Sequence, residues 1–225
     1  MKVLYEDNHI IIVYKESGEI VQGDKTGDTP LSDTVKEWLR AKYDKPGNVY
    51  LGVVHRLDRP VAGIVVFGKT SKATSRLSRM FRDGEVHKTY WAIVGNRPAK
   101  ESGTLTNWIV RNERINKSFV YDKEVKNSKK AILEYRVIGV GERYTLLEVK
   151  LLTGRHHQIR CQLAHIGCPI RGDLKYGAPR SNPDGSISLL SHKVEFEHPV
   201  SHKQISVVSP LPGGRLWREL AAGVE

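Results

Sequence analysis

A run of strand-like segments with no helix-like segment between them most constrains what this chain can fold into. The segments cover residues 103–110, 117–122, 131–138 and 143–152, and turns rich in Gly, Asn and Lys separate them. Strands that follow one another directly along the chain favour antiparallel pairing over a doubly wound parallel sheet. The sequence therefore predicts an α+β fold with a mixed, largely antiparallel central sheet flanked by helices.

Hydrophobic periodicity and turn residues place the other elements. Further strands are expected at residues 2–6, 9–15, 50–54, 63–67 and 86–94, and helices at 29–42, 71–82 and 155–166. Thr29, Ser71 and Thr153 are the expected N-caps of the three helices, because their hydroxyls can accept a hydrogen bond from a free backbone N–H. The remainder after residue 167 is expected to form loops and short strands.

The length of the chain limits the number of domains, and its apolar segments and cysteines indicate the cellular compartment. The 225 residues suit one large domain or two fused halves. Glu6 and Asp7 interrupt the apolar start, and no apolar stretch approaches the ~18 residues of a membrane span, so a cytoplasmic protein without membrane contact is expected. Cys161 and Cys168 would stand about 10.5 Å apart along a helix, beyond the ~7 Å that a disulfide bridges, which predicts free thiols.

The charge of the chain points to an anionic partner. Lys and Arg total 36 against 25 acids, which gives a net charge of +11. Lys72, Arg76 and Arg79 fall on one face of the helix expected at 71–82, opposite its apolar face. A second basic stretch comprises Arg111, Arg114, Lys117, Lys123, Lys126, Lys129 and Lys130. One basic helix face alone is typical of a solvated surface, but two such clusters favour a nucleic-acid phosphate surface.

Three segments carry residues suited to chemistry, and the first is the loop His55-Arg56-Leu57-Asp58-Arg59. It places one carboxylate among two guanidiniums and an imidazole. One interpretation is an internal ion pair that holds a loop. The other is an aspartate kept ionised by positive charge and able to act as nucleophile or base.

The second segment is Lys88-Thr89-Tyr90. Within a strand Lys88 and Tyr90 project to the same face. The tyrosine is either an edge-strand side chain with its hydroxyl in water or an aromatic plate for a nucleic-acid base, with the lysine beside it for a phosphate.

The third segment runs from Leu152 to Arg160. If Thr153 caps a helix, Arg155 lies in the first turn, where the helix dipole disfavours a cation, so a carboxylate partner such as Asp58 is expected. Gln158, Gln162 and His165 would share a polar side of that helix, which is either functional or simply solvated.

The histidines and cysteines do not form a metal motif. His156, His157, His165, Cys161 and Cys168 lack the Cys-x-x-Cys or His-Glu-x-x-His spacing of zinc sites, so no metal is expected. No Gly-x-Gly-x-x-Gly motif, phosphate loop or Ser-His-Asp signature is present either.

At these three segments the sequence resembles the RluA-type pseudouridine synthases. The matching stretches are His55 to Pro60 with Gly63, Lys88 to Tyr90, Leu152 to Arg155, His157 to Arg160, His165 to Ile170, Gly172-Asp173, Tyr176-Gly177 and the opening Tyr5 to Asn8. The likeness runs in order over residues 4–200. It implies a single catalytic domain over residues 1–225, in which a long antiparallel sheet carries an active site in a cleft across it. It also implies isomerisation of uridine to pseudouridine in ribosomal or transfer RNA, without cofactor or metal.

The resemblance also implies roles for single residues. Asp58 matches the catalytic aspartate, Tyr90 the tyrosine that stacks on the target base, Arg155 the basic partner of the aspartate, and Arg56 the arginine that fills the gap left by the displaced nucleotide. RNA contacts are expected from His55, Arg56, Arg59, Lys72, Arg76, Arg79, Lys88, His157 and Gln158. A monomer is expected, without the N-terminal RNA-binding domain that many relatives carry.

The chain departs from the family pattern at a few positions, and two other functions stay open. Val61 and Ala62 replace common hydroxyl residues, Lys15 is followed by Glu16 rather than Pro, and Cys161-Gln162 follow the last arginine motif. The main alternative is a catalytically inactive RNA-binding or ribosome-assembly protein of the same fold. The other is a nucleoside hydrolase that releases the base.

Overall fold

The computed structural model describes residues 1–224, which divide into two compact units. Unit 1 comprises Met1–Val86 and Ser191–Pro210, and unit 2 comprises His87–Leu190 and the segment from Leu211 on. The predicted α+β class and the largely antiparallel strand pairing are both confirmed.

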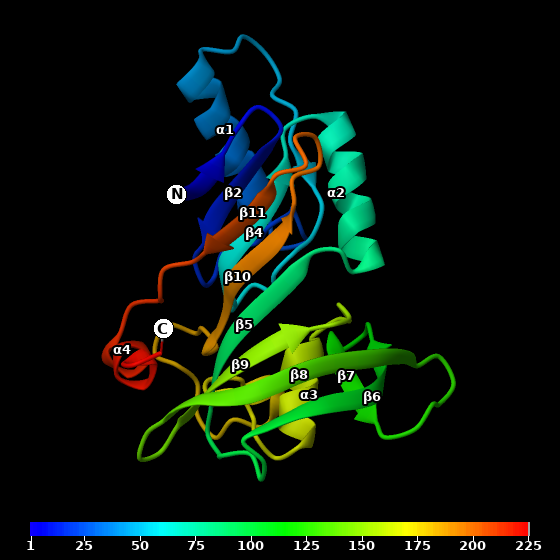
Figure 1. Cartoon of the computed structure of the whole chain (residues 1–225), viewed down its shortest axis with the longest axis vertical. Helices are drawn as coiled ribbons and strands as arrows, with labels where there is room; N and C mark the ends of the chain where they lie inside the picture. Colours follow the sequence, from blue (N-terminus) through cyan, green and yellow to red (C-terminus); the bar gives the residue numbers. More distant parts are fainter. Residues whose placement is uncertain (225) are drawn as a thin grey trace. The chain divides into compact units, whose positions relative to one another are not determined.

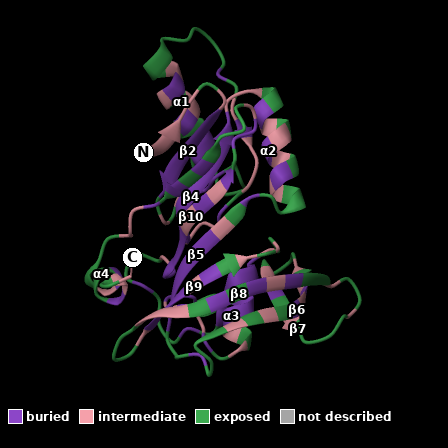
Figure 2. Cartoon of the chain, in the orientation of Figure 1, coloured by how far each residue is buried: buried purple, intermediate pink, exposed green. Residues whose placement is uncertain are grey.

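The sheet of unit 1 contains two antiparallel hairpins, one near each end of the unit's sequence, with a further long strand between them. β1 (Lys2–Glu6) pairs antiparallel with β2 (Ile10–Lys15), and β2 pairs antiparallel with β4 (Ala62–Gly68). β10 (Leu189–Glu197) lies beside β4 and pairs with β11 (Gln204–Val208), while the two-residue β3 (Gly52–Val53) pairs with the end of β4. Every residue of β2 and β4 is buried, as Figure 2 shows, because these strands are almost wholly apolar.

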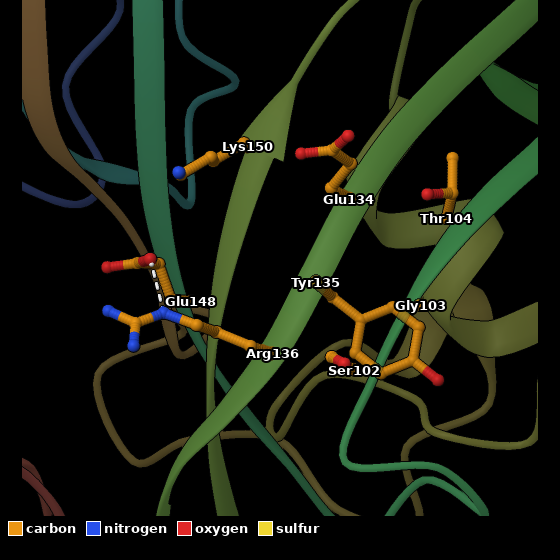
Figure 3. Close-up of a pocket in the computed structure, with 8 residues that line it drawn as sticks. All are labelled: Ser102, Gly103, Thr104, Glu134, Tyr135, Arg136, Glu148 and Lys150. Carbon is orange, nitrogen blue, oxygen red and sulfur yellow. Dashed lines mark hydrogen bonds and ion pairs between the residues drawn. The ribbon is translucent and has the colours of Figure 1, made fainter.

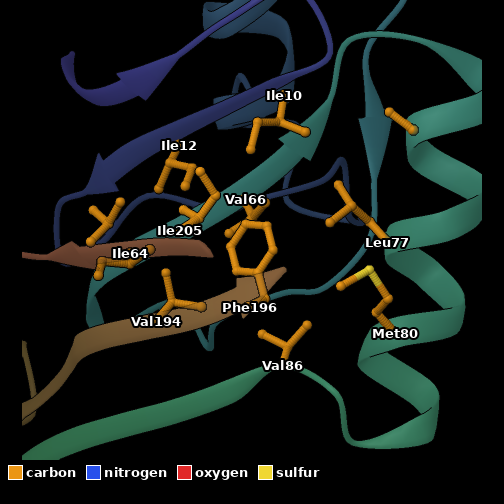
Figure 4. Packing of buried hydrophobic residues seen from close by; sticks show 12 residues of the cluster. Ile10, Ile12, Ile64, Val66, Leu77, Met80, Val86, Val194, Phe196 and Ile205 are labelled. Carbon is orange, nitrogen blue, oxygen red and sulfur yellow. The ribbon is translucent and has the colours of Figure 1, made fainter. Parts of the chain in front are cut away.

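Two helices accompany the sheet of unit 1, α1 (Leu31–Tyr43) and α2 (Ser71–Asp83). Ala73, Leu77 and Met80 of α2 are buried, as their spacing predicts, and join a core with residues of β2, β4, β10 and β11 (Figure 4). α2 approaches the strands closely at the paired glycines Gly52 and Gly68, where an added Cβ would stand about 2 Å from the Thr74 side chain.

The strands of unit 2 form an antiparallel array in the order β5, β9, β8, β6, β7. Their bounds are β5 His87–Val94, β6 Ser102–Asn112, β7 Lys117–Tyr121, β8 Lys129–Val140 and β9 Thr145–Leu151. All five strands were expected from the sequence. β6 and β8 extend one or two residues beyond the expected ends, whereas β5, β7 and β9 are slightly shorter than expected. α3 (Gln158–His165) contacts β6 and β7 (Figure 1), and the short η1 (Leu174–Tyr176) and α4 (Arg215–Ala221) complete the unit.

Several predicted boundaries are wrong for local reasons. Thr70 rather than Ser71 caps α2, since its Oγ1 accepts the Ala73 N–H at 3.1 Å, and Pro30 rather than Thr29 precedes α1. The strand expected at 50–54 is reduced to Gly52–Val53. The chain after residue 167 holds the nine-residue β10, β11 and the helix α4 instead of only loops and short strands.

The largest error concerns the helix expected to start at Arg155. α3 starts at Gln158, and its N-cap His157 has left-handed backbone dihedrals (φ 53°) without a side-chain cap. Thr153 caps no helix, and Arg155 lies in the preceding turn, so the predicted conflict between Arg155 and a helix dipole does not exist. Cys161 and Cys168 are both free and buried, as expected.

Candidate functional site

In unit 1 the loop that carries Asp58 is anchored by a buried lysine. Lys15 ends β2 with no exposed surface, and its Nζ donates to the carbonyl oxygens of Glu16 (3.0 Å), Arg59 (3.0 Å) and Val61 (2.7 Å). Burial lowers the pKa of Lys15 to about 8, while the negative charge of Asp58 acts in the opposite direction. The ammonium therefore fixes the main chain immediately after Asp58.

The strand that follows the loop fixes its other end. The Val61 N–H donates to the Asp58 carbonyl at 3.0 Å, which closes a turn around Pro60. Gly63 at the start of β4 has φ +120°, and a Cβ there would stand 2.3 Å from the Ser191 carbonyl oxygen. Only glycine fits this close approach of two backbones.

His55 and Leu57 also belong to the packing of the loop. The His55 ring accepts the Val66 N–H on Nε2 at 2.9 Å and stacks on Phe81, with the ring centroids 4.4 Å apart. Leu57 is buried. Because Nε2 accepts this hydrogen bond, the neutral ring carries its hydrogen on Nδ1.

The basic residues of unit 1 that are predicted to contact RNA differ in whether other protein groups already bind their side chains. Arg56 is exposed, whereas Arg59 forms salt bridges with Asp28 (2.6 Å) and Asp24 (3.5 Å). On α2, Lys72 and Arg79 are exposed. The Arg76 guanidinium donates to the Pro199 carbonyl at 2.6 Å, which ties the helix to the β10–β11 turn.

In unit 2, Lys88 and Tyr90 project from the same face of β5, as predicted. They stand opposite Leu151 and Val149 of β9, and Tyr90 is only 7% exposed, which excludes a tyrosine held out in water. Burial lowers the pKa of Lys88. A Cβ added at Gly154 would lie 3.7 Å from the Lys88 Nζ, so β5 and the turn after β9 meet here.

Arg155 lies in that turn, which the Gln158 side chain holds in shape. The Gln158 Oε1 accepts the Thr153 hydroxyl (2.8 Å) and the Arg155 N–H (2.9 Å), and its Nε2 donates to the Ile132 carbonyl (3.1 Å). Arg155 itself is exposed, and its Nε donates to the Lys130 carbonyl at 2.9 Å. The turn thus takes its form from a glutamine rather than from a helix cap.

Most of the polar side of α3 is buried rather than solvated. Gln158 is 3% exposed and Gln162 is fully buried, where the Gln162 Nε2 donates to Asn107 Oδ1 at 2.8 Å. Arg160 forms a two-pronged, buried salt bridge with Asp173 (2.7 and 2.9 Å). His165 remains on the surface beside Asp122.

Two stacked histidines complete the arrangement around the turn. The rings of His156 and His157 lie 3.7 Å apart, and Ser118 Oγ contacts both His156 Nδ1 and the His156 carbonyl at 2.8 Å. His157 contacts the Tyr176 hydroxyl at 2.8 Å, and burial lowers its pKa to about 2. Sequence reasoning missed Lys15, Ser118 and Tyr176 as organising residues. Comparison with the family pattern pointed to two of them, since Tyr176 lies in a matching motif and Lys15 stands where the family has a Lys-Pro pair.

Two negative findings concern the described chain. No group of three or more His, Cys, Asp or Glu side chains in residues 1–224 is placed to hold a metal ion. No helix within the same range has the length and hydrophobicity needed to span a bilayer.

A shallow cavity of about 310 Å³ lies over β6, β8 and β9 and includes none of the predicted site residues. Figure 3 shows Thr104, Glu134 and Lys150 along it, together with the Arg136–Glu148 ion pair at 2.7 Å. Its opposite charges neutralise one another, so it does not compete with the segments around Asp58, Tyr90 and Arg155 as a candidate site.

Comparison with known proteins gives a consistent result. The family model for RNA pseudouridylate synthase matches residues 9–165. An uncharacterized RNA pseudouridine synthase of Chlorobaculum parvum is 33% identical over 93% of this chain and 70% of its own length. Ribosomal large subunit pseudouridine synthase C of Vibrio cholerae is 31% identical over 93% of this chain and 65% of its own length.

The fold is also that of solved structures. The chain of human RNA pseudouridylate synthase domain containing 4 matches with a TM-score of 0.80 and 22% identity, over 98% of this chain and 92% of that one. The chain spans about two thirds of the length of its curated bacterial relatives. The match over residues 9–165 and the identity to these relatives place the chain in the RNA pseudouridylate synthase family, whose members are RNA-modifying isomerases.

Proposed function

We propose that this chain isomerises specific uridines to pseudouridine in structured ribosomal or transfer RNA, with Asp58 as the essential ionised carboxylate. The observation that carries the proposal is the family match over residues 9–165, which includes Asp58, Tyr90 and Arg155. Four relatives, among them the Vibrio cholerae protein, are named as pseudouridine synthases of the large ribosomal subunit, which favours ribosomal RNA as the first substrate to test.

The main chain next to Asp58 is held in place. Lys15 holds the carbonyls of the next residues, and the positive charges of Lys15 and Arg56 lie in or beside the same loop. Attack on the sugar carbon, attack on the base and removal of a sugar proton all need an ionised aspartate. The proposal therefore holds for each of these routes.

In this proposal Tyr90 receives the target base and Arg155 is the basic residue of the catalytic set. A uracil within an RNA stack must be extruded before its glycosidic carbon can be reached, at a cost of a few kcal/mol. A buried aromatic ring such as Tyr90 recovers part of that cost by stacking. The exposed Arg155 guanidinium projects from a turn that is already fixed by Gln158.

Exposed basic residues supply the remaining RNA affinity. Lys72 and Arg79 on α2 carry charge that is free for phosphates, as do Arg114 and Lys126 in the basic stretch of unit 2. Arg59 contributes less in this proposal, because Asp28 and Asp24 already neutralise it. Counterion release from such contacts makes binding strongly dependent on salt.

Pseudouridine mapping of total RNA from cells with and without the protein tests the function. We expect at least one site that depends on the protein and that is restored by the wild type but not by Asp58→Asn. Asp58→Asn is expected to bind RNA as the wild type does. Asp83→Asn, at the exposed end of α2, is the matched control and should restore the site.

The two alternatives give different results in the same experiment. A binding or assembly protein would leave pseudouridine unchanged in every RNA. A nucleoside hydrolase would release free uracil when incubated with RNA, whereas an isomerase keeps the base attached to the same sugar.

A further inference from the structure

Unit 2 contains a second cavity, of about 650 Å³, that none of the predicted site residues lines. Three arginines reach it from separate segments: Arg143 from the β8–β9 turn, Arg171 from the segment before η1, and Arg180 from the segment after η1. The remaining lining residues are glycines, prolines and neutral polar side chains, with one tyrosine and one alanine. No acidic residue lines the cavity.

Arg171 is held in place without losing its charge. Its guanidinium carbon lies 5.5 Å from the centre of the Tyr144 ring, and its Nη1 is 3.4 Å from the Ser188 hydroxyl. A cation over an aromatic face is oriented but stays positive. The pKa of Asp184 is lowered chiefly by the hydrogen bonds that its carboxylate accepts from the Ser186 hydroxyl (2.6 Å) and N–H (3.0 Å), and the Arg171 charge is the smallest of the causes.

The three pocket arginines differ from other arginines of the same unit. Arg97, Arg136, Arg160 and Arg215 each face a carboxylate in a salt bridge. Within residues 1–224 none of Arg143, Arg171 and Arg180 forms such a pair. Three unneutralised guanidiniums around one hollow repel each other, and a bound anion relieves that repulsion.

The walls of the pocket are stiff, which suits a preformed site. Pro169, Pro179 and Pro183 line it, and each fixes its own backbone φ angle. A pocket that is already shaped loses little conformational freedom when its ligand binds. Its volume lies within the ~300–1,000 Å³ range of ligand sites and exceeds what a single inorganic phosphate needs.

We propose that the arginine pocket (Arg143, Arg171 and Arg180) binds phosphodiester groups of RNA outside the target nucleotide, an inference that rests on the proposed function for its ligand. Guanidinium forks match phosphate oxygens in two-pronged hydrogen bonds. The net charge of +11 favours a polyanion over a small free anion as the occupant.

The test compares two double variants of the full chain that remove the same charge from unit 2. R143Q/R180Q removes two exposed pocket arginines, and R97Q/R215Q removes two exposed arginines that are paired with Glu101 and Glu219. R171Q, which removes the half-buried member, is measured alongside, and thermal melting shows whether each variant is folded. The dissociation constant for a substrate RNA is measured over a series of salt concentrations.

We expect R143Q/R180Q to lower the magnitude of the slope of log K against log salt by about 0.7 for each lost phosphate contact. At 0.1 M salt this corresponds to about a fivefold weaker affinity per contact. In turnover, KM for RNA should rise while kcat is retained, and R97Q/R215Q should match the wild type.

Equal salt slopes and equal RNA affinities for the two double variants would overturn the inference. It would also be overturned if titration calorimetry showed that the pocket binds inorganic phosphate while R143Q/R180Q left the affinity for RNA unchanged. Failure of the proposed function looks different. In that case no pseudouridine forms with the wild type, whatever the salt dependence of RNA binding.

Discussion

The two anchored segments of the candidate site are held by different physical means. The Asp58 loop in unit 1 depends on one buried ammonium that binds three main-chain carbonyls. The Arg155 turn in unit 2 depends on uncharged side chains, chiefly Gln158. The Asp58 loop therefore depends on the contacts of a single lysine with its main chain, whereas the Arg155 turn depends on several smaller hydrogen bonds to one glutamine.

Breaking the lysine anchor should have the largest effect. Lys15→Met keeps the apolar stem but leaves buried carbonyls without a donor, and we expect a loss of about 3 kcal/mol in unfolding free energy. Urea denaturation of both proteins measures it. Lys36→Met, which removes a half-exposed lysine of a surface ion pair on α1, is the control and should change stability by less than about 0.5 kcal/mol.

The pH dependence of that difference sharpens the test. Burial lowers the pKa of Lys15 to about 8 from an ordinary value of about 10.5, so between these values the unfolded chain holds the proton more tightly than the folded protein. Raising the pH from 8 to 10.5 therefore increases the contribution of Lys15 to the unfolding free energy. The penalty of Lys15→Met should be larger at pH 10 than at pH 7, and a smaller penalty at pH 10 would contradict the buried ammonium.

Loss of the glutamine should cost less and affect activity more selectively. Gln158→Leu removes the acceptor of Thr153 and of the Arg155 N–H, and we expect about 2 kcal/mol of destabilisation. If the turn positions Arg155, kcat should fall at temperatures where the variant is fully folded. Gln22→Leu, at an exposed position, is the control. A stable variant with normal kcat would show that the turn holds its form without Gln158.

The buried His157 should make unit 2 sensitive to mild acid. Its pKa falls from about 6.5 in the unfolded chain to about 2 in the folded protein because of burial, so below pH 6.5 only the unfolded chain takes up the proton. Unfolding free energy should therefore drop by about 1 kcal/mol between pH 7 and pH 5.5 from this residue. His157→Gln should lack this component, and an identical pH profile in both proteins would argue against it.

The smallest effect is expected at His156, which joins the turn to the start of β7 and the residue before it. His156→Ala removes its ring contacts with Ser118 (2.8 Å) and with Asn116 (3.0 Å), at a cost below about 1 kcal/mol. Hydrogen exchange of the β6–β7 turn should rise more than that of β5. If this turn were equally protected from exchange in the wild type and the variant, Ser118 and Tyr176 would hold it without the His156 ring.

The strands were predictable and the polar interior was not, for a physical reason. Apolar runs such as residues 10–14 and 63–67 identify buried strands directly, and the burial of Ala73, Leu77 and Met80 follows from helical spacing. A lysine at a strand end ordinarily reaches solvent, so nothing local marks Lys15 as buried. Its partners Arg59 and Val61 lie more than forty residues away.

The start of α3 was misplaced for a related reason. Residues 155–166 have a helix-compatible pattern, but the Gln158 side chain bonds Thr153 and the Arg155 N–H, and His157 adopts left-handed dihedrals. Such side-chain hydrogen bonds compete with helix formation and leave no periodic signal. Residues Asp58, Tyr90 and Arg155 were identified by family resemblance, and their catalytic roles remain predictions.

The lysine anchor also limits how the chain can vary in length. Because one ammonium contacts the carbonyls on both sides of Pro60, inserting or deleting a single residue between Asp58 and β4 would carry one of those oxygens away from it. The segment from Asp58 to Val61 is therefore a fixed spacer, whose length is constrained more tightly than the identity of most of its side chains.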